Sequence, residues 1–321
     1  MKSNILFAVL LSMGLVVLGA TPVAGQSFPA KPIHIIASPP GGANDFHARL
    51  IGQGLNEIAG WQVIVDNRPS GGFIQGDLLM RSAPDGYTLL VAAGSVTIGP
   101  LFEKAPYEVL RDFAPVSLMS TAPSVLSVHP SLPVKSVKQL IALAKARPGE
   151  LNFSTSGVGS ANHLPAELFN YLARVKLVRI NYRGAGPALT ALISGEVHLM
   201  FATAASVAPH IKAKRVRALA ITSAKPSALI PDLPTIAASG VPGYDYSSPW
   251  GLVAPAKTPP AIINRLNQEI VKVLKIPEIR RRFMNTGTEV AASTPEEYGA
   301  VIKTEQATWG KVIEALGLAK K

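Results

Sequence analysis

A short apolar run that breaks at a proline–glycine turn and continues as a helix constrains this chain more than any other stretch. Residues 32–37 have the composition of a buried strand. Residues 39–42, Pro-Pro-Gly-Gly, cannot continue that strand, and Asn44 or Asp45 can cap a helix that runs through Ile51. The turn and the helix start gather free backbone N–H groups around one point, which suits an anion. An ordinary turn whose donors bind water or a side chain is the alternative.

The same unit returns later in the chain. Residues 151–155 form a short strand, residues 156–160 a loop of serine, glycine and valine, and residues 161–172 a helix that tolerates Pro165 in its first turn. Two glycine-rich helix starts that face each other across a cleft can hold one carboxylate through neutral backbone donors. Each helix terminus would contribute about 0.3–2 kcal/mol.

The rest of the chain alternates strands with helices, which predicts α/β lobes with mostly parallel sheets. Ligands of such sheets sit outside the carboxyl ends of strands, and three such ends come early, at residues 40–42, 70–72 and 93–95. Residues 113–128 are a longer β-rich segment typical of a crossing between lobes, and residues 242–255 resemble a return crossing. Further strands are predicted at 62–66, 87–92, 178–182, 197–201 and 216–221, and helices at 73–81, 136–147, 204–212, 259–274, 277–284 and 295–316.

The N-terminal residues 1–25 have the pattern of a signal peptide. Lys2 precedes an apolar core at residues 5–18, and small residues favour cleavage near Gly25-Gln26. We therefore expect export to the periplasm, with an uncleaved anchor as the alternative. The sequence contains no cysteine, which excludes disulfides, thiolate nucleophiles and a lipid-anchored lipoprotein.

Composition and motifs argue against several other classes of protein. The net charge is +11, but the basic residues are scattered and few aromatic residues lie among them, so nucleic acid is not an expected partner. The chain has no P-loop, nucleophile elbow, zinc-protease or EF-hand motif, no recognisable carboxylate pair, and no histidine pair with metal-ligand spacing. We expect no enzyme activity, no metal and no cofactor. His34 and His198 fall within apolar strands and are interpreted as structural, whereas His163 either reaches a ligand or packs locally.

Several motifs in order make the chain resemble the Bug family of periplasmic solute receptors of tripartite tricarboxylate transporters. The resemblance covers essentially the whole mature chain and rests on Phe28-Pro29-Ala30-Lys31-Pro32-Ile33, residues 40–45, Ala48-Arg49, Asn67-Arg68-Pro69, residues 84–90, residues 154–160, Tyr182-Arg183-Gly184 and Trp250-Gly251.

The resemblance implies a two-lobed, clamshell-type periplasmic-binding-protein fold with two crossing segments. The lobes would comprise residues 26–127 plus 249–321 and residues 128–248. It also implies a ligand carboxylate held by both glycine loops and a membrane transporter as partner. We expect a monomer, as is usual for a soluble receptor. Together with the local reasoning on His163, the resemblance predicts these ligand-binding residues: Gly41, Gly42, Asp45, Phe46, Ser156, Gly157, Ser160, His163, Gly184 and Thr203.

The chain also departs from the family pattern. Gly99 stands before Pro100 where the family has asparagine, and residues 188–191 and 197–198 lack the family's aspartates. These changes leave open which carboxylate binds. A receptor that signals to a sensor, or an exported enzyme on the same fold, remains an alternative to transport.

Overall fold

The computed structural model describes residues 28–69, 73–227 and 230–318 of the 321-residue chain. All elements below belong to the unit Lys31–Lys321. The predicted signal peptide, its cleavage site and the predicted strand end at residues 70–72 lie outside the described residues.

The strands of the described chain join in the order β2-β1-β3-β9-β4-β7-β5-β6, with β8 and β10 also paired to β4. Their bounds are β1 Ile33–Ala37, β2 Val63–Asn67, β3 Thr88–Ala92, β4 Phe113–Val128, β5 Asn152–Thr155, β6 Val178–Asn181, β7 Leu199–Thr203, β8 Arg217–Ile221, β9 Ser247–Pro255 and β10 Glu289–Val290. The alternation of strands and helices is confirmed, because β2-β1-β3 and β6-β5-β7 are each parallel.

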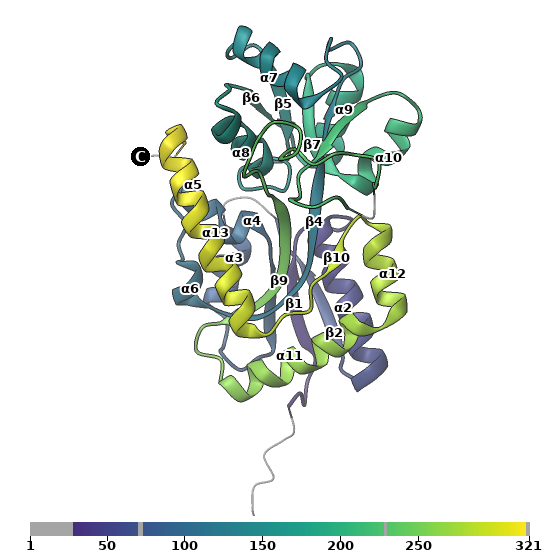
Figure 1. Cartoon of the computed structure of the whole chain (residues 1–321). Helices are drawn as coiled ribbons and strands as arrows, with labels where there is room; N and C mark the ends of the chain where they lie inside the picture. Colours follow the sequence, from purple (N-terminus) through teal and green to yellow (C-terminus); the bar gives the residue numbers. More distant parts are fainter. Residues whose placement is uncertain (1–27, 70–72, 228–229, 319–321) are drawn as a thin grey trace, which may run out of the picture. The chain divides into compact units, whose positions relative to one another are not determined.

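The 16-residue strand β4 links two parts of the sheet (Figure 1). Residues 113–123 pair with β9, whereas residues 124–128 pair with β7 and β8. We call β1, β2, β3, β9, β10 and the first part of β4 the first sheet segment. The second sheet segment consists of β5, β6, β7, β8 and the remainder of β4.

Helices alternate with most of the strands along the chain. They are α2 Ala43–Ala59, α3 Ile74–Met80, α4 Gly94–Thr97, α5 Gly99–Phe102, α6 Val109–Asp112, α7 Val137–Ala146, α8 Leu164–Ala173, α9 Ala185–Ser194, α10 Ala204–Lys212, α11 Pro260–Lys275, α12 Pro277–Asn285 and α13 Pro295–Leu316. Ser136 caps α7, as predicted, because its side chain accepts a hydrogen bond from the N–H of Gln139.

Two helix starts differ from the sequence prediction. The N-cap of α2 is Gly42, not Asn44 or Asp45, and it makes no side-chain cap. Asp45 instead reaches back to the N–H of Gly41, one residue before the cap. Helix α8 begins at Leu164 instead of Ala161, because the intervening residues form turns.

Buried apolar side chains pack mainly within the two sheet segments, and α13 joins them. Tyr298 and Ile302, near the start of α13, pack in a cluster with side chains of β1, β3 and β9. Trp309 and Ile313, near its end, pack in the cluster that contains Phe169 of α8. Helix α13 therefore spans the junction that β4 also crosses. Within the described part of the chain, no helix is both long and apolar enough to cross a membrane.

Candidate functional site

A cavity of about 1110 Å³ lies where the loops of the two sheet segments meet. Its size falls slightly above the usual range of small-molecule sites. Seven of the ten predicted ligand-binding residues line it: Gly41, Gly42, Ser156, Gly157, Ser160, Gly184 and Thr203. Asp45, Phe46 and His163 are not among the lining residues, and each has internal contacts described below.

The first loop, residues 38–45, is braced by a carboxylate. Asp45 accepts hydrogen bonds from the N–H of Gly41 at 3.0 Å, from Arg49 Nε at 2.9 Å and from Asn67 Nδ2 at 2.8 Å. Burial tends to raise the pKa of Asp45, but these hydrogen bonds and the charge of Arg49 hold that pKa below its usual value. Asp45 is therefore ionised, and its hydrogen bonds hold the turn in shape although Asp45 does not line the cavity.

The wall behind the first loop is aromatic. Trp250 donates from Nε1 to Asn44 Oδ1 at 3.1 Å, and both residues line the cavity. His47 stacks on Trp250 with ring centroids 5.1 Å apart and lies 2.6 Å from the carbonyl oxygen of Ala43. Burial lowers the pKa of His47 to about 4, so its imidazole is neutral at pH 7. The ring of Phe46 lies nearly perpendicular to those of His47 and Phe283, and Phe46 does not line the cavity.

The second loop, residues 156–162, is braced by neutral groups. Asn162 Oδ1 accepts from the N–H of Ser156 at 3.0 Å, and the hydroxyl of Ser160 lies 2.6 Å from the same oxygen. The N–H of Gly157 donates to Thr155 Oγ1 at 3.1 Å. No carboxylate takes part in these bonds, so their pattern does not depend on an ionised acid.

His163 supports the second loop from the protein interior. The N–H of Gly159 donates to its Nδ1 at 3.1 Å, and its Nε2 lies 3.3 Å from Glu167 Oε1 and 2.8 Å from the guanidinium of Arg179. Burial lowers the pKa of His163, Glu167 opposes that change, and Arg179, 2.8 Å from Nε2, adds to it. His163 is fully buried, so its contacts match the local-packing alternative.

Several backbone donors of the two loops are already occupied, and others are free. The N–H of Gly41 binds Asp45 and that of Gly42 binds Pro39. By contrast, the N–H groups of Ala43 and Asn44, in the first turn of α2, make no hydrogen bond with another described residue. Those of Val158 and Ala161 are equally unpaired within the described chain. All four of these residues line the cavity.

Charged side chains are rare in the cavity. Among its described lining residues, only Arg183 and Glu103 carry charge. The guanidinium of Arg183 makes no hydrogen bond or ion pair with another described residue. Thr203 Oγ1 donates to Ser206 Oγ at 3.0 Å, and both residues line the cavity. In the described ranges, no group of histidines and carboxylates is placed to hold a metal ion.

Sequence reasoning missed several residues of this cavity. Asn44 comes two residues after Gly42 and Asn162 three residues after Gly159, so their position was a usable signal. Trp250 and Phe73 come from distant parts of the chain. Trp250 belongs to a family motif, but no local pattern places either residue in the cavity. His198 is half-buried, accepts from the N–H of Asn152 at 2.9 Å and does not line the cavity. His34 was interpreted as structural, but its side chain is exposed at the surface of β1.

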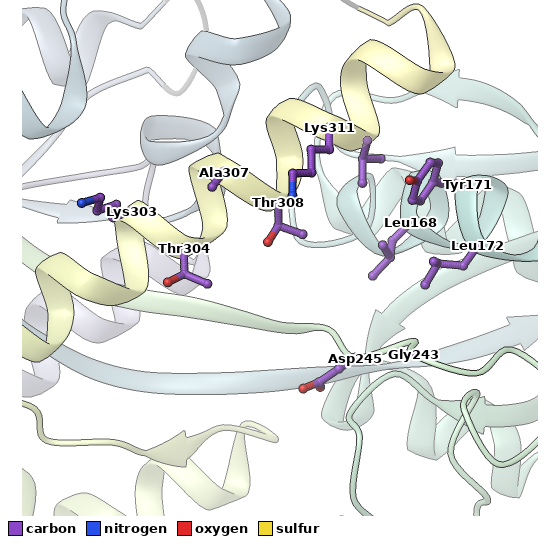
Figure 2. A pocket seen from close by; sticks show the side chains of 11 residues that line it. Leu168, Tyr171, Leu172, Gly243, Asp245, Lys303, Thr304, Ala307, Thr308 and Lys311 are labelled. Atoms are coloured by element: carbon purple, nitrogen blue, oxygen red, sulfur yellow. The ribbon is translucent and has the colours of Figure 1, made fainter.

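A second hollow of about 540 Å³ lies away from the glycine loops, between α13 and α8 (Figure 2). Lys303, Thr304, Thr308 and Lys311 follow one side of α13, opposite the apolar side chains of α8. No residue of the two glycine-rich loops at 38–45 and 156–162 belongs to its described lining. We therefore take the larger cavity as the candidate site.

Comparison with known proteins points to a family of solute receptors. Residues 47–318 match the sequence profile described as the tripartite tricarboxylate transporter family receptor. The chain belongs to this family. Protein BugT of Bordetella pertussis is 37% identical over 308 residues, which cover 94% of each chain.

Two solved structures share the fold. Rpa4515 of R. palustris, solved with adipate, is 33% identical, with a TM-score of 0.82 over 91% of this chain and 99% of that one. MatC of Rhodopseudomonas palustris, solved with malate, is 27% identical, with a TM-score of 0.80 over 89% and 100%. The receptor described here thus has the two-lobed α/β fold of periplasmic solute-binding proteins, as its sequence predicted.

Proposed function

We propose that this receptor binds a small carboxylate in the larger cavity and delivers it to a tripartite tricarboxylate-type transporter in the membrane. The observation that carries the proposal is the set of unpaired backbone N–H groups. Ala43 and Asn44 supply two from the first loop, and Val158 and Ala161 supply two from the second. The first two lie at the start of α2, where backbone donors attract an anion without any countercharge from a side chain, and the other two belong to turns before α8.

The predicted site residues then have distinct roles in the proposal. Gly41 and Gly157 shape the turns, with φ angles of +82° and +131°. Ser156 and Ser160 hold the second loop, and Asp45 holds the first. Gly184 and Thr203 border the cavity beside Arg183. We propose the lobes at residues 26–127 plus 249–321 and 128–248, a division supported by the change of partners along β4.

No catalytic group is assigned in this proposal. His163 and His47 are buried, neutral and engaged in support of the loops. Adipate and malate, found in the two family structures, are the first ligands to test here.

A titration followed by tryptophan fluorescence tests the proposal, because Trp250 lines the cavity. Dicarboxylates, aromatic acids and amino acids form the panel. At least one carboxylate is expected to change the emission in a saturable way. A folded protein that responds to no carboxylate would contradict the proposed ligand class.

The Ala43→Pro variant tests the donors directly. Proline lacks the N–H and is well tolerated at the first position of a helix, which Ala43 occupies. The preceding Gly42 has φ −81° and ψ 166°, an extended conformation compatible with a following proline. One hydrogen bond to a charged group is worth about 1.5–3 kcal/mol, so affinity should fall roughly 10- to 100-fold. Ala43→Ser keeps the N–H and serves as the control.

Delivery to a transporter is a separate part of the proposal. Receptor immobilised with and without bound carboxylate should retain the transporter's membrane subunits only, or more strongly, when the ligand is present. Retention of a sensor protein in place of those subunits would support the signalling alternative.

A further inference from the structure

Two glycines from opposite sheet segments touch at the edge of the cavity. Gly94 is the first residue of α4 and follows β3, whereas Gly159 belongs to the second loop. A Cβ atom added to Gly94 would lie 2.7 Å from the carbonyl oxygen of Gly159, well below the 3.4 Å at which ordinary contact begins. A Cβ added to Gly159 would lie 3.1 Å from the carbonyl oxygen of Gly94. The two backbones are therefore in direct contact, with no room for a methyl group.

This contact is coupled to both ligand loops. Gly94 lies just after β3, which pairs with β1, the strand that leads into the first loop. Gly159 lies within the second loop, and its N–H is fixed by His163. Both glycines also line the cavity. The distance between their backbones therefore affects the distance between the donors of the two loops.

We propose that Gly94 is a spacer, a positioning residue that sets the separation of the two loops through its contact with Gly159. A side chain at this position holds the loops apart and weakens the binding of every ligand that both loops must grip. The predicted loss of affinity rests on the proposed carboxylate site, whereas the predicted change in the distance between the two loops does not.

The local backbone does not by itself require glycine at position 94. Gly94 is not among the glycines with positive φ. Alanine is also a better helix former than glycine, by about 1 kcal/mol. The methyl group of an alanine would instead meet the Gly159 carbonyl oxygen and Leu164 Cδ1, at 2.7 and 2.9 Å. Because the first of these is a backbone atom, the conflict is relieved by a shift of one loop away from the other.

The test compares Gly94→Ala with Gly186→Ala. Gly186, near the start of α9, also lacks a positive φ, and a Cβ there meets nothing within 4 Å, so it controls for the added methyl. Because the chain has no cysteine, spin labels can be attached at K145C on α7 and K275C at the end of α11. Both lysines are exposed. Helix α7 packs in the cluster that contains Phe169, whereas α11 packs against α2.

In ligand-free protein, Gly94→Ala is expected to shift the label-to-label distances to longer values, whereas Gly186→Ala leaves them unchanged. If the wild type binds adipate and malate, Gly94→Ala should weaken both at least tenfold and by a similar factor, mainly through faster dissociation. Unchanged label-to-label distances, or a variant that fails to fold, would contradict the proposed role of Gly94 as a spacer. Longer distances in a protein that binds no carboxylate would support the spacer and contradict the proposed ligand class.

Discussion

The two ligand loops have the same task in the proposal, but different chemistry holds them in shape. The first is braced by the ionised Asp45, which binds Arg49 and Asn67. The second is braced by the neutral amide of Asn162 and nearby hydroxyl groups. In the proposal, the carboxylate of Asp45 is tolerated beside the anion site because the cation of Arg49 stays paired with it. The second loop has no such pair, so a new negative charge there should be far more harmful.

The largest effect is expected for Asn162→Asp, which places a carboxylate in the second loop without a paired cation. At a separation of about 5 Å and an effective dielectric constant of about 20, repulsion of a ligand carboxylate costs about 3 kcal/mol, or roughly 100-fold in affinity. Calorimetric titration at pH 7 measures the loss. Asn181→Asp makes the same change at the exposed end of β6, outside the cavity, and should bind normally. Equal affinity of both variants would remove the proposed distinction between the loops.

A second large effect concerns the buried histidine behind the first loop. The pKa of His47 is lowered from 6.5 to about 4, so the unfolded state binds a proton that the folded state does not. Stability is therefore lost as the pH falls from 6.5 to about 4, by about 3 kcal/mol at most. Urea unfolding at several pH values measures this loss.

The matched variant for this prediction is His47→Gln, which keeps hydrogen-bonding capacity but does not titrate. Its stability at pH 7 should be lower than that of the wild type, because stacking on Trp250 is lost. Between pH 6.5 and 4 its stability should change less steeply. An identical slope in both proteins would mean that His47 is not responsible.

Replacing Gly41 and Gly157 by alanine should reduce stability by different amounts. At Gly41 and Gly157 an added Cβ meets nothing within 4 Å, so only backbone strain matters. The φ of +82° at Gly41 lies close to the left-handed helical region, at a cost of about 1 kcal/mol for alanine. The φ of +131° at Gly157 lies far outside it, and alanine there should cost about 2 kcal/mol. Thermal unfolding and ligand titration of the two variants would give the order, and the reverse order would contradict it.

The smallest effect is expected for Asp45→Asn. The variant keeps an acceptor for the N–H of Gly41 but loses the hydrogen bond from Asn67 and the ion pair with Arg49, whose side chain is 56% exposed. Solvent screening limits that pair to about 1 kcal/mol or less. Wild-type stability should fall at high salt towards that of the variant. A variant that lost all binding would show that the charge of Asp45 acts on the ligand itself.

Local patterns in the sequence were sufficient for most of the fold. Apolar runs that end at glycine or proline marked β1, β3 and β5, and Ser136 marked the start of α7. The short strand β10 was not predicted, because two residues carry no periodicity and its pairing with β4 depends on a contact far along the chain.

The site was less predictable than the fold for the same physical reason. Glycine turns identified both loops, yet the free donors belong to Ala43 and Val158, among other residues, because Asp45 and Thr155 occupy those of the glycines. Which N–H stays unpaired depends on side chains that fold back onto the turn. Trp250 enters the wall from β9, about 200 positions after the first loop along the sequence.

Helix α13, at the end of the chain, completes a hydrophobic cluster that earlier segments begin. The cluster around Phe169 and Tyr246 lacks Trp309, Val312 and Ile313 until the end of the chain is in place. A polypeptide that emerges from its N-terminus, from a ribosome or through a membrane, would reach these residues last. The middle of the sequence would then keep an apolar surface uncovered until nearly the whole chain had emerged, and a chain shortened before Trp309 could not cover it.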